Sequence, residues 1–239
     1  MKALILAAGL GTRLRPLTDS RPKALVEVCG KTMLERTIFT LAGAGISDFV
    51  VNVHHFAPMI VDFLEAHDNF GFNIEISDES DLLRNTGGAI LHAAPYLAKE
   101  ELFLVHNVDI MSNLDIAWLK GVAASSGALA TLAVSCRKTS RYLLCDEKGM
   151  LMGWTNLTTQ EVKSPYANLD VTKCRKVAFS GIHFVSGKIF DLMAGRPQVF
   201  SVIDLYLDIC KDYPIICAEC PGLELKDLGT PSAIAQIKA

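Results

Sequence analysis

The chain has 239 residues, and half of them are hydrophobic, which suits one large α/β domain or two small ones and argues against disorder. The 23 Lys and Arg against 26 Asp and Glu give a formal net charge of −3, so no basic excess is present to bind a nucleic-acid backbone or an anionic membrane. Composition therefore favours a small-molecule ligand over a polymer.

The first half of the chain alternates short apolar runs with segments of helical spacing. Strands are predicted at 2–6, 48–53, 73–76 and 102–106, and helices between them at 33–44, 58–66 and 88–97. Strands that alternate with helices form βαβ units. We therefore expect an α/β fold with a Rossmann-like, mostly parallel sheet that carries helices on both faces.

The second half is mixed. Strands are predicted at 128–135, 142–145, 150–154 and 177–185, and helices at 114–124, 186–193, 202–211 and 232–238. Asp146-Glu147-Lys148-Gly149 is turn-like and predicts an antiparallel hairpin, whereas 156–175 is polar and irregular. We expect a small antiparallel addition to the sheet, within a single domain that covers 1–239.

The cellular compartment is predicted from the apolar runs and the cysteines. No run reaches the roughly 18 to 20 apolar residues of a membrane helix, and the apolar start continues into Arg13 and Arg15 before an export signal could form. The seven cysteines are odd in number and scattered through apolar runs, which is typical of reduced core thiols. We expect a cytoplasmic monomer or small homo-oligomer without nucleic-acid or membrane partners.

A glycine-rich segment follows the first predicted strand. Residues 8–18 read AGLGTRLRPLT, and Lys23 follows shortly after. Gly9 and Gly11 allow backbone N–H groups to turn toward an anion, at the strand end where open α/β sheets bind phosphates. With its Arg13 and with Lys23 close by, this loop suits a nucleoside triphosphate whose leaving group is pyrophosphate. We call residues 8–18 the phosphate loop.

A dinucleotide-binding loop of the form G-x-G-x-x-G is the alternative interpretation of this segment. Leu14 stands where that pattern needs its third glycine, and Arg13, Arg15 and Lys23 are unusual around such a loop. The P-loop pattern G-x-x-x-x-G-K-[ST] is absent as well. An NAD-dependent oxidoreductase is therefore the weaker hypothesis.

The loop resembles the opening motif of the sugar-1-phosphate nucleotidylyltransferases, which join a sugar 1-phosphate to an NTP and release pyrophosphate. The resemblance runs nearly end to end, through Asn85-Thr86-Gly87-Gly88-Ala89, Asn107-Val108-Asp109, Phe179-Ser180-Gly181-Ile182 and Asp227-Leu228-Gly229-Thr230-Pro231. The chain is most similar to the N-acetylmuramate-1-phosphate uridylyltransferases of peptidoglycan recycling, then to mannose-1-phosphate guanylyltransferase-like proteins. This resemblance implies the nucleotide-diphospho-sugar transferase fold, with an NTP-binding half at 1–125 and a sugar-binding half at 126–239.

Two carboxylates are candidate metal ligands. Asp109 follows an apolar strand and Asp227 lies near the end of the chain. Held together over the phosphate loop, they would bind Mg²⁺, which takes oxygen ligands and bridges phosphates. The resemblance implies the same role, although Asp109 alone could cap a helix and Val108 stands where many relatives have glycine.

The resemblance also implies the residues that bind the substrates. Gly87 and Gly88 would let a flat nucleobase lie against bare backbone, whereas Thr86 could be a helix N-cap. No side chain decides between uracil, thymine and guanine. The implied catalytic residues are Arg13 and Lys23, the nucleotide-binding residues are Ala8, Gly9, Gly11, Thr12, Arg13, Glu79, Gly87 and Gly88, and the sugar-binding residues are Asn107 and Gly181.

Two other groups of residues are interpreted as structural. His54 and His55 are neighbours on a strand end and point to opposite faces, so they cannot easily share one ion. Cys217 and Cys220 form a C-x-x-C without a second such pair, and we interpret them as buried thiols on a late strand.

Rival functions remain open besides nucleotidyl transfer. A non-catalytic protein that senses nucleotides or NDP-sugars is the first rival, although all four of Arg13, Lys23, Asp109 and Asp227 are present. An NDP-sugar glycosyltransferase is disfavoured because no D-x-D surrounds Asp109.

Overall fold

A parallel sheet forms the first half of the molecule. The computed structural model describes residues 1–238. Parallel pairing gives the order β6-β1-β4-β5 for strands β1 (Lys2–Leu6), β4 (Asp48–Val53), β5 (Asn73–Asp78) and β6 (Leu102–Asn107). The register places Leu6 between Asn52 and Asn107. The carboxyl ends of three strands therefore meet at one edge, as the alternating pattern predicts.

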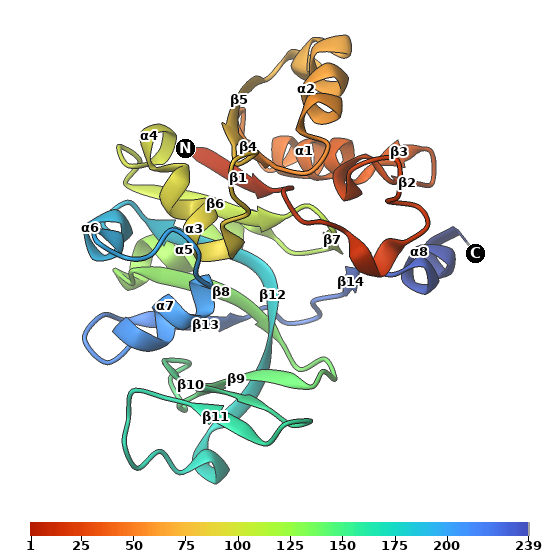
Figure 1. Ribbon diagram of the computed structural model, residues 1–239. Coiled ribbons are helices and arrows are strands. Elements are labelled where there is room, and N and C mark those ends of the chain that lie inside the picture. Colours follow the sequence, from red (N-terminus) through yellow and green to blue (C-terminus); the bar gives the residue numbers. More distant parts are fainter. Residues whose placement is uncertain (239) are drawn as a thin grey trace.

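A long strand, β12 (Arg175–Ser186), connects this sheet to the second half. It pairs antiparallel with β6, with β8 (Ala130–Ser135) and, through its first residues, with β9 (Arg141–Cys145). The remaining strands are β10 (Leu151–Asn156) and β11 (Glu161–Lys163), which extend β9, and β13 (Ile215–Glu219), which pairs in parallel with β8. In Figure 1, β12 curves from the central sheet to the small β9–β11 lobe below it. The predicted antiparallel addition is confirmed.

Helices cover both faces of the sheet. One face packs against α1 (Met33–Gly43), α2 (Ala57–Ala66), α5 (Ile116–Ser126) and α8 (Pro231–Lys238), and the other against α3 (Asn85–His92), α4 (Ala94–Leu97), α6 (Ile189–Met193) and α7 (Val202–Ile209). Leu4 and Ile5 belong to different core clusters, because successive strand residues point to opposite faces. No helix in the described part of the chain is long and apolar enough to span a membrane.

Short elements account for most differences from the predicted pattern. The sequence pattern misses the strand pairs β2 (Glu27–Val28) with β3 (Lys31–Thr32) and β7 (Ile110–Ser112) with β14 (Leu225–Asp227), and the 3-10 turns η1 (Thr12–Leu14), η2 (Lys23–Leu25), η3 (Asp68–Gly71) and η4 (Val171–Lys173). The segment 156–175 is not wholly irregular, since it contains β11 and η4.

Two predicted helices differ from the observed ones by more than a residue or two at an end. The helix predicted at 88–97 is two helices, α3 and α4, because Pro95 has no N–H to donate and so begins a new helix rather than continuing one. The helix predicted at 186–193 begins only at Ile189, since β12 continues through Ser186 along β6.

Two histidines are buried in the sheet. His106 Nδ1 donates to the Asn107 carbonyl oxygen over 2.8 Å, whereas neither ring nitrogen of His183 has a hydrogen-bond partner among the described residues. Burial lowers the pKa of His106 to about 4. Burial, with a smaller contribution from His106, lowers the pKa of His183 to about 3. Both rings are therefore neutral in the folded protein at neutral pH.

We expect the protein to lose stability as the pH falls below about 6.5. The unfolded chain then binds protons that the two neutral histidines of the folded state do not, at a cost of about 1.4 kcal/mol per pH unit for each ring. His183→Leu should remove about half of this slope between pH 6 and 4. Urea unfolding across this range measures it, and an unchanged slope in the variant would contradict the assignment.

Candidate active site

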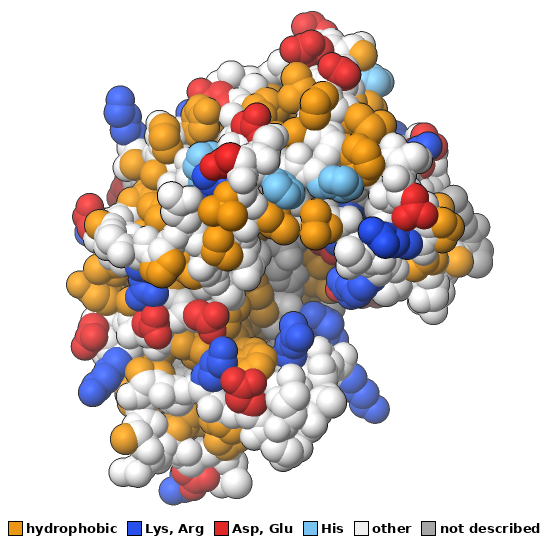
Figure 2. All heavy atoms as spheres, viewed as in Figure 1, with side chains coloured by type: hydrophobic (Ala, Val, Ile, Leu, Met, Phe, Trp, Pro, Cys, Tyr) orange, Lys and Arg blue, Asp and Glu red, His pale blue; other side chains and the backbone are white. Residues whose placement is uncertain are grey.

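A cavity of about 470 Å³ lies at the carboxyl ends of β1, β4 and β6. The space-filling view shows the molecule hollowed between its upper part and the β9–β11 lobe (Figure 2). Six of the residues predicted for substrate, metal or catalysis line the cavity. The lining residues are Leu6, Ala8, Gly9, Lys23, Asn52, Glu79, Leu83, Asn85, Thr86, Ala89, Asn107, Val108, Asp109 and Val199.

The two glycines of the phosphate loop serve different purposes. A Cβ placed on Gly9 would have no neighbour within 4 Å, so the space above this backbone is open. Gly11 has a φ of +64°, and a Cβ there would lie 2.9 Å from Thr18 Cγ2, while Thr18 Oγ1 donates to the Gly11 carbonyl over 2.8 Å. Thr12 and Arg13 continue into η1 as exposed residues. Gly9 thus leaves room for a ligand, whereas Gly11 shapes the turn.

Asn52, at the end of β4, fixes the start of this loop. Its Oδ1 accepts from the backbone N–H groups of Ala7 and Ala8, over 2.6 and 3.3 Å. Its Nδ2 donates to Glu79 Oε1 over 2.9 Å. From the sequence, Asn52 is expected to lie nearer the nucleotide than His54 and His55, but its hydrogen bonds to the loop and to Glu79 are not predicted.

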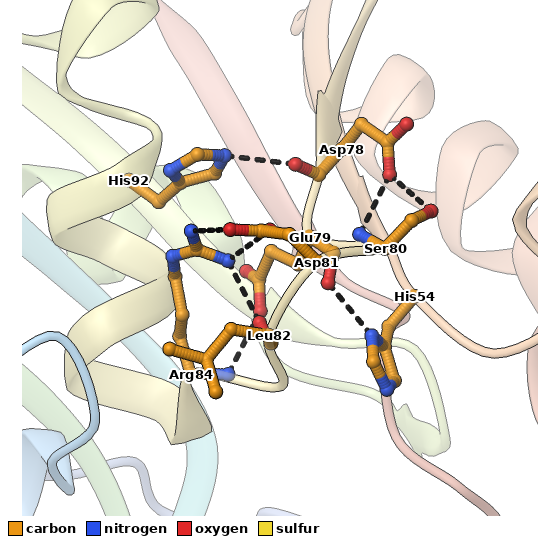
Figure 3. Close-up of polar contacts among 8 residues, drawn as sticks. All are labelled: His54, Asp78, Glu79, Ser80, Asp81, Leu82, Arg84 and His92. Carbon is orange, nitrogen blue, oxygen red and sulfur yellow. Dashed lines mark hydrogen bonds and ion pairs between the residues drawn. The ribbon is translucent and has the colours of Figure 1, made fainter.

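Glu79 is fully buried in the loop after β5 (Figure 3). Besides Asn52, its carboxylate accepts from the Arg84 backbone N–H over 3.2 Å, and its carbonyl oxygen lies 2.7 Å from His54 Nδ1. The Arg84 guanidinium in turn forms a bidentate salt bridge with the Asp81 carboxylate. Glu79 lines the cavity, yet its carboxylate accepts hydrogen bonds from Asn52 and from the Arg84 backbone. Its predicted contact with a nucleotide therefore stays a prediction.

We expect Asn52→Ala to lower the free energy of unfolding by about 2 kcal/mol, because the buried Glu79 carboxylate and two loop N–H groups lose a partner. The loosened loop should also bind pyrophosphate about tenfold more weakly. The matched control is Asn73→Ala, whose amide donates to the Asp48 carboxylate over 3.0 Å at an exposed position and should cost about 0.5 kcal/mol or less. Equal losses in the two variants would contradict this role for Asn52.

Lys23 and Asp109 form an ion pair inside the cavity. Lys23 begins η2, and Asp109 directly follows β6. The two side chains are 13% and 12% exposed. The ion pair thereby holds the Lys23 ammonium beside the phosphate loop, where it can also bind an anionic ligand.

The pairing of β14 with β7 brings Asp227 to Asp109. Asp227 lies opposite Ile110 in this ladder, and the Leu228 N–H donates to the Asp109 carbonyl over 2.8 Å. Asp227 Oδ1 accepts from the Gly229 N–H over 2.8 Å. A Cβ on Gly229 would lie 2.6 Å from Arg13 Nη2, so the Arg13 guanidinium covers Gly229 beside Asp227. Arg13 and Asp227 therefore lie together at the exposed edge of the site.

Asp109 and Asp227 offer carboxylate oxygens, the ligand type that a hard cation such as Mg²⁺ takes. The described residues contain no group of three or more His, Cys, Asp or Glu side chains that could hold a metal ion by themselves. Asp109, just before β7, and Asp227, on the partner strand β14, would supply two hard oxygen ligands, and magnesium commonly completes its shell with phosphate oxygens and water.

Gly87 and Gly88 are packed against the segment that precedes α7. A Cβ on Gly88 would lie 2.1 Å from the Gln198 carbonyl oxygen, and one on Gly87 would lie 2.4 Å from the Phe200 ring. Both glycine N–H groups donate to the Phe200 carbonyl, over 2.9 and 3.2 Å. Asn85, Thr86 and Ala89 line the cavity instead. Close packing thus explains both glycines, and their contact with a base stays a prediction.

Thr86 does not cap α3. The N-cap of that helix is Arg84, without a side-chain hydrogen bond, while Thr86 Oγ1 accepts from the Val202 N–H at the start of α7 over 3.0 Å.

Asn107 and Gly181, the two residues predicted for the sugar, contact each other. Gly181 has a φ of +79°, and a Cβ there would lie 2.7 Å from Asn107 Nδ2. Any larger residue at 181 would displace the Asn107 side chain from the cavity. Val108, next to Asn107, is 4% exposed and packs in the core, with its N–H donating to Leu6 and its carbonyl accepting from Thr37.

The residues interpreted as structural show no shared site. His54 contacts the Glu79 carbonyl, whereas the His55 ring lies 4.0 Å from the Phe56 ring. Cys217 is buried on β13 as predicted, whereas Cys220 lies just after that strand and is only partly buried. All seven cysteines are free thiols, but Cys29 and Cys136 are exposed and so are not core thiols.

Comparison with known proteins supports the resemblance seen in the sequence. The family model described as nucleotidyl transferase matches residues 2–142. The chain is 42% identical over 130 residues to the N-acetylmuramate alpha-1-phosphate uridylyltransferase of Caulobacter vibrioides, which covers 54% of this chain and 51% of that protein. It is 31% identical over 200 residues to the mannose-1-phosphate guanyltransferase of Schizosaccharomyces pombe, covering 82% and 53%. The chain thus spans about half the length of the curated relatives it matches.

Solved structures share the fold over nearly the whole chain. HddC from Yersinia pseudotuberculosis, complexed with GMP-PN, is 23% identical with a TM-score of 0.74, over 99% of this chain and 97% of that one. A candidate glucose-1-phosphate thymidylyltransferase from Bacillus anthracis, in complex with sucrose, is 18% identical with a TM-score of 0.82, over 99% and 93%. The predicted fold is confirmed, and because the family model covers more than half of the residues, this chain belongs to the nucleotidyl transferase family.

Proposed function

We propose that this protein joins a sugar 1-phosphate to an NTP and releases pyrophosphate. The observation that carries the proposal is one cavity lined by Ala8 and Gly9 of the phosphate loop, by the Lys23–Asp109 ion pair and by Asn107. In this proposal residues 1–125 bind the NTP and 126–239 hold the sugar phosphate, within a single domain.

The finer proposal is the formation of UDP-N-acetylmuramate in cytoplasmic cell-wall recycling. It is supported by the similarity to the uridylyltransferases of Caulobacter vibrioides and of Neisseria meningitidis serogroup B, the latter 40% identical over 115 residues. The guanyltransferase relatives make mannose 1-phosphate with GTP the second substrate pair to test.

The chemistry is a direct in-line attack. An oxygen of the sugar phosphate forms a bond to the α-phosphorus of the NTP, while the bond from that phosphorus to the bridging oxygen of the β-phosphate breaks and pyrophosphate leaves. The attacking oxygen is already an anion, so no general base is required. The protein therefore contributes position and charge.

The residues of the phosphate loop, Lys23 and the two carboxylates have proposed roles in this reaction. The backbone at Gly9, Gly11 and Thr12 cradles the phosphates, Lys23 contacts phosphates near the transferred group, and Arg13 holds the departing pyrophosphate. Asp109 and Asp227 would hold Mg²⁺, which when bound lowers the charge repulsion between the two phosphates.

Pyrophosphate release tests the proposal. The protein is incubated with Mg²⁺ and each of UTP, dTTP and GTP, combined with the 1-phosphates of N-acetylmuramate, mannose and glucose. We expect release that requires both substrates, greatest with UTP and N-acetylmuramate 1-phosphate. Tight NTP binding without release in any combination would instead identify a sensing protein.

A further inference from the structure

A second cavity, of about 370 Å³, lies where the β9–β11 lobe meets the start of α7. Its volume is in the range of small-ligand pockets. It is lined by Arg137, Thr139, Arg141, Tyr142, Leu143, Trp154, Lys163, Phe179, Ser201, Ile203 and Asp204. Three aromatic rings and three cations converge in this cavity, and none of these residues has a place in the proposed phosphate chemistry.

The charges of this second cavity are incompletely balanced. Lys163 Nζ pairs with Asp204 over 3.1 Å and lies 5.5 Å from the centre of the Trp154 ring. Arg137 donates to the Phe179 carbonyl over 3.1 Å, and Arg141 lines the same wall. Within residues 1–238 no carboxylate lies at ion-pair distance from either arginine. The two guanidinium groups are therefore available to an external anion, and their planar donor arrays match a carboxylate.

Residues close in sequence on two segments lie at the two cavities, although no residue lines both. Gly181 touches Asn107 in the first cavity, and Phe179, two residues earlier on β12, lines the second. Val199 lines the first cavity, and Ser201, two residues later, lines the second. Figure 2 shows Lys and Arg side chains at the edge of the hollow, on the lower lobe. A sugar held beside Asn107 can thus extend a substituent toward the arginines.

We propose that the second cavity binds a carboxylate carried by the sugar, so that Arg137 and Arg141 select an acidic sugar 1-phosphate. This inference rests on the proposed function. The anomeric phosphate cannot be the group that these arginines hold, because it must reach the α-phosphorus beside Lys23 and Asp109 in the first cavity. The aromatic side chains Tyr142 and Trp154 supply apolar faces for the ring and its substituents.

The test compares two sugars that differ only in the carboxylate-bearing substituent. N-acetylmuramate 1-phosphate is N-acetylglucosamine 1-phosphate with an added lactyl ether. The ratio of their kcat/KM values is measured for the wild type, Arg137→Gln, Arg141→Gln and the control Lys148→Gln, which removes an exposed cation in the same lobe outside the cavity. We expect the wild type and the control to favour the acidic sugar, and each arginine variant to lose about 10- to 100-fold of this preference.

Other outcomes separate the inference from the proposed function. Equal turnover of both sugars by the wild type would overturn the inference and leave nucleotidyl transfer intact, and so would an equal loss on both sugars in the arginine variants. If no sugar phosphate is turned over, the proposed function fails. Calorimetric titration with free N-acetylmuramic acid and N-acetylglucosamine then decides: binding of the acid alone, abolished by Arg141→Gln, supports the cavity, and equal or absent binding of both overturns it.

Discussion

Lys23→Ala should lower kcat/KM for nucleotidyl transfer about a thousandfold. The Lys23 ammonium lies with Asp109 in the cavity next to the phosphate loop, and a fixed cation at a developing phosphate charge is worth factors of this size. The variant also leaves the Asp109 carboxylate, only 12% exposed, without its partner, which should reduce the free energy of unfolding by about 2 kcal/mol.

Pyrophosphate release under saturating Mg²⁺ measures the loss, and thermal unfolding shows that the variant is folded at the assay temperature. Lys31→Ala is the matched control, because Lys31 pairs with Glu35 at the surface with 52% of its side chain exposed. Its turnover should equal that of the wild type. A folded Lys23→Ala protein with near-normal turnover would refute the catalytic assignment of Lys23.

Gly88→Ala should be strongly destabilising, by about 3 kcal/mol. The added methyl would lie 2.1 Å from the Gln198 carbonyl oxygen, and a backbone group cannot move aside as a flexible side chain can. Relief of this overlap would push α3 away from residues 198–200 and break the hydrogen bonds from Gly87 and Gly88 to the Phe200 carbonyl. Thr86, on the cavity wall, would move with the helix.

Gly121→Ala provides the control, since it makes the same change inside α5, where a Cβ would have no neighbour within 4 Å. There alanine should stabilise the protein by about 0.5 to 1 kcal/mol, because glycine is the poorer helix former. Urea unfolding of both variants gives the comparison. A Gly88→Ala protein as stable as the wild type would show that residues 198–200 do not pack tightly on α3.

The regular part of the fold could be predicted because its signal is local. The apolar runs at β1, β4 and β6 and the helical spacing of α1 are each contained in a few consecutive residues. The β7–β14 pair could not be predicted in this way, since each strand has three residues and its partner lies more than a hundred residues away. That pairing brings Asp227 to Asp109, so only the family resemblance joined the two carboxylates in advance.

In the candidate site, too, the residues of a local motif could be predicted from the sequence, whereas residues whose roles depend on distant contacts could not. Gly9 and Lys23 belong to one short motif, so their place in the lining of the same cavity follows from the sequence. The roles of Asn52 and Glu79 depend on hydrogen bonds between β4 and the loop after β5, which no spacing reveals. Gly87 and Gly88 match a family motif, but the structure adds the carbonyl of Gln198 as a reason for glycine.

The fate of a labelled α-phosphate tests the central claim most directly. The protein is mixed with Mg²⁺ and α-³²P UTP, with and without N-acetylmuramate 1-phosphate, and the products are separated after rapid acid quenching. We predict label only in UTP when the sugar phosphate is absent, and label in the NDP-sugar, equimolar with released pyrophosphate, when it is present. Label that appears as UMP would contradict direct nucleotidyl transfer by this site, and so would label that stays in UTP with N-acetylmuramate 1-phosphate and in α-³²P GTP with mannose 1-phosphate.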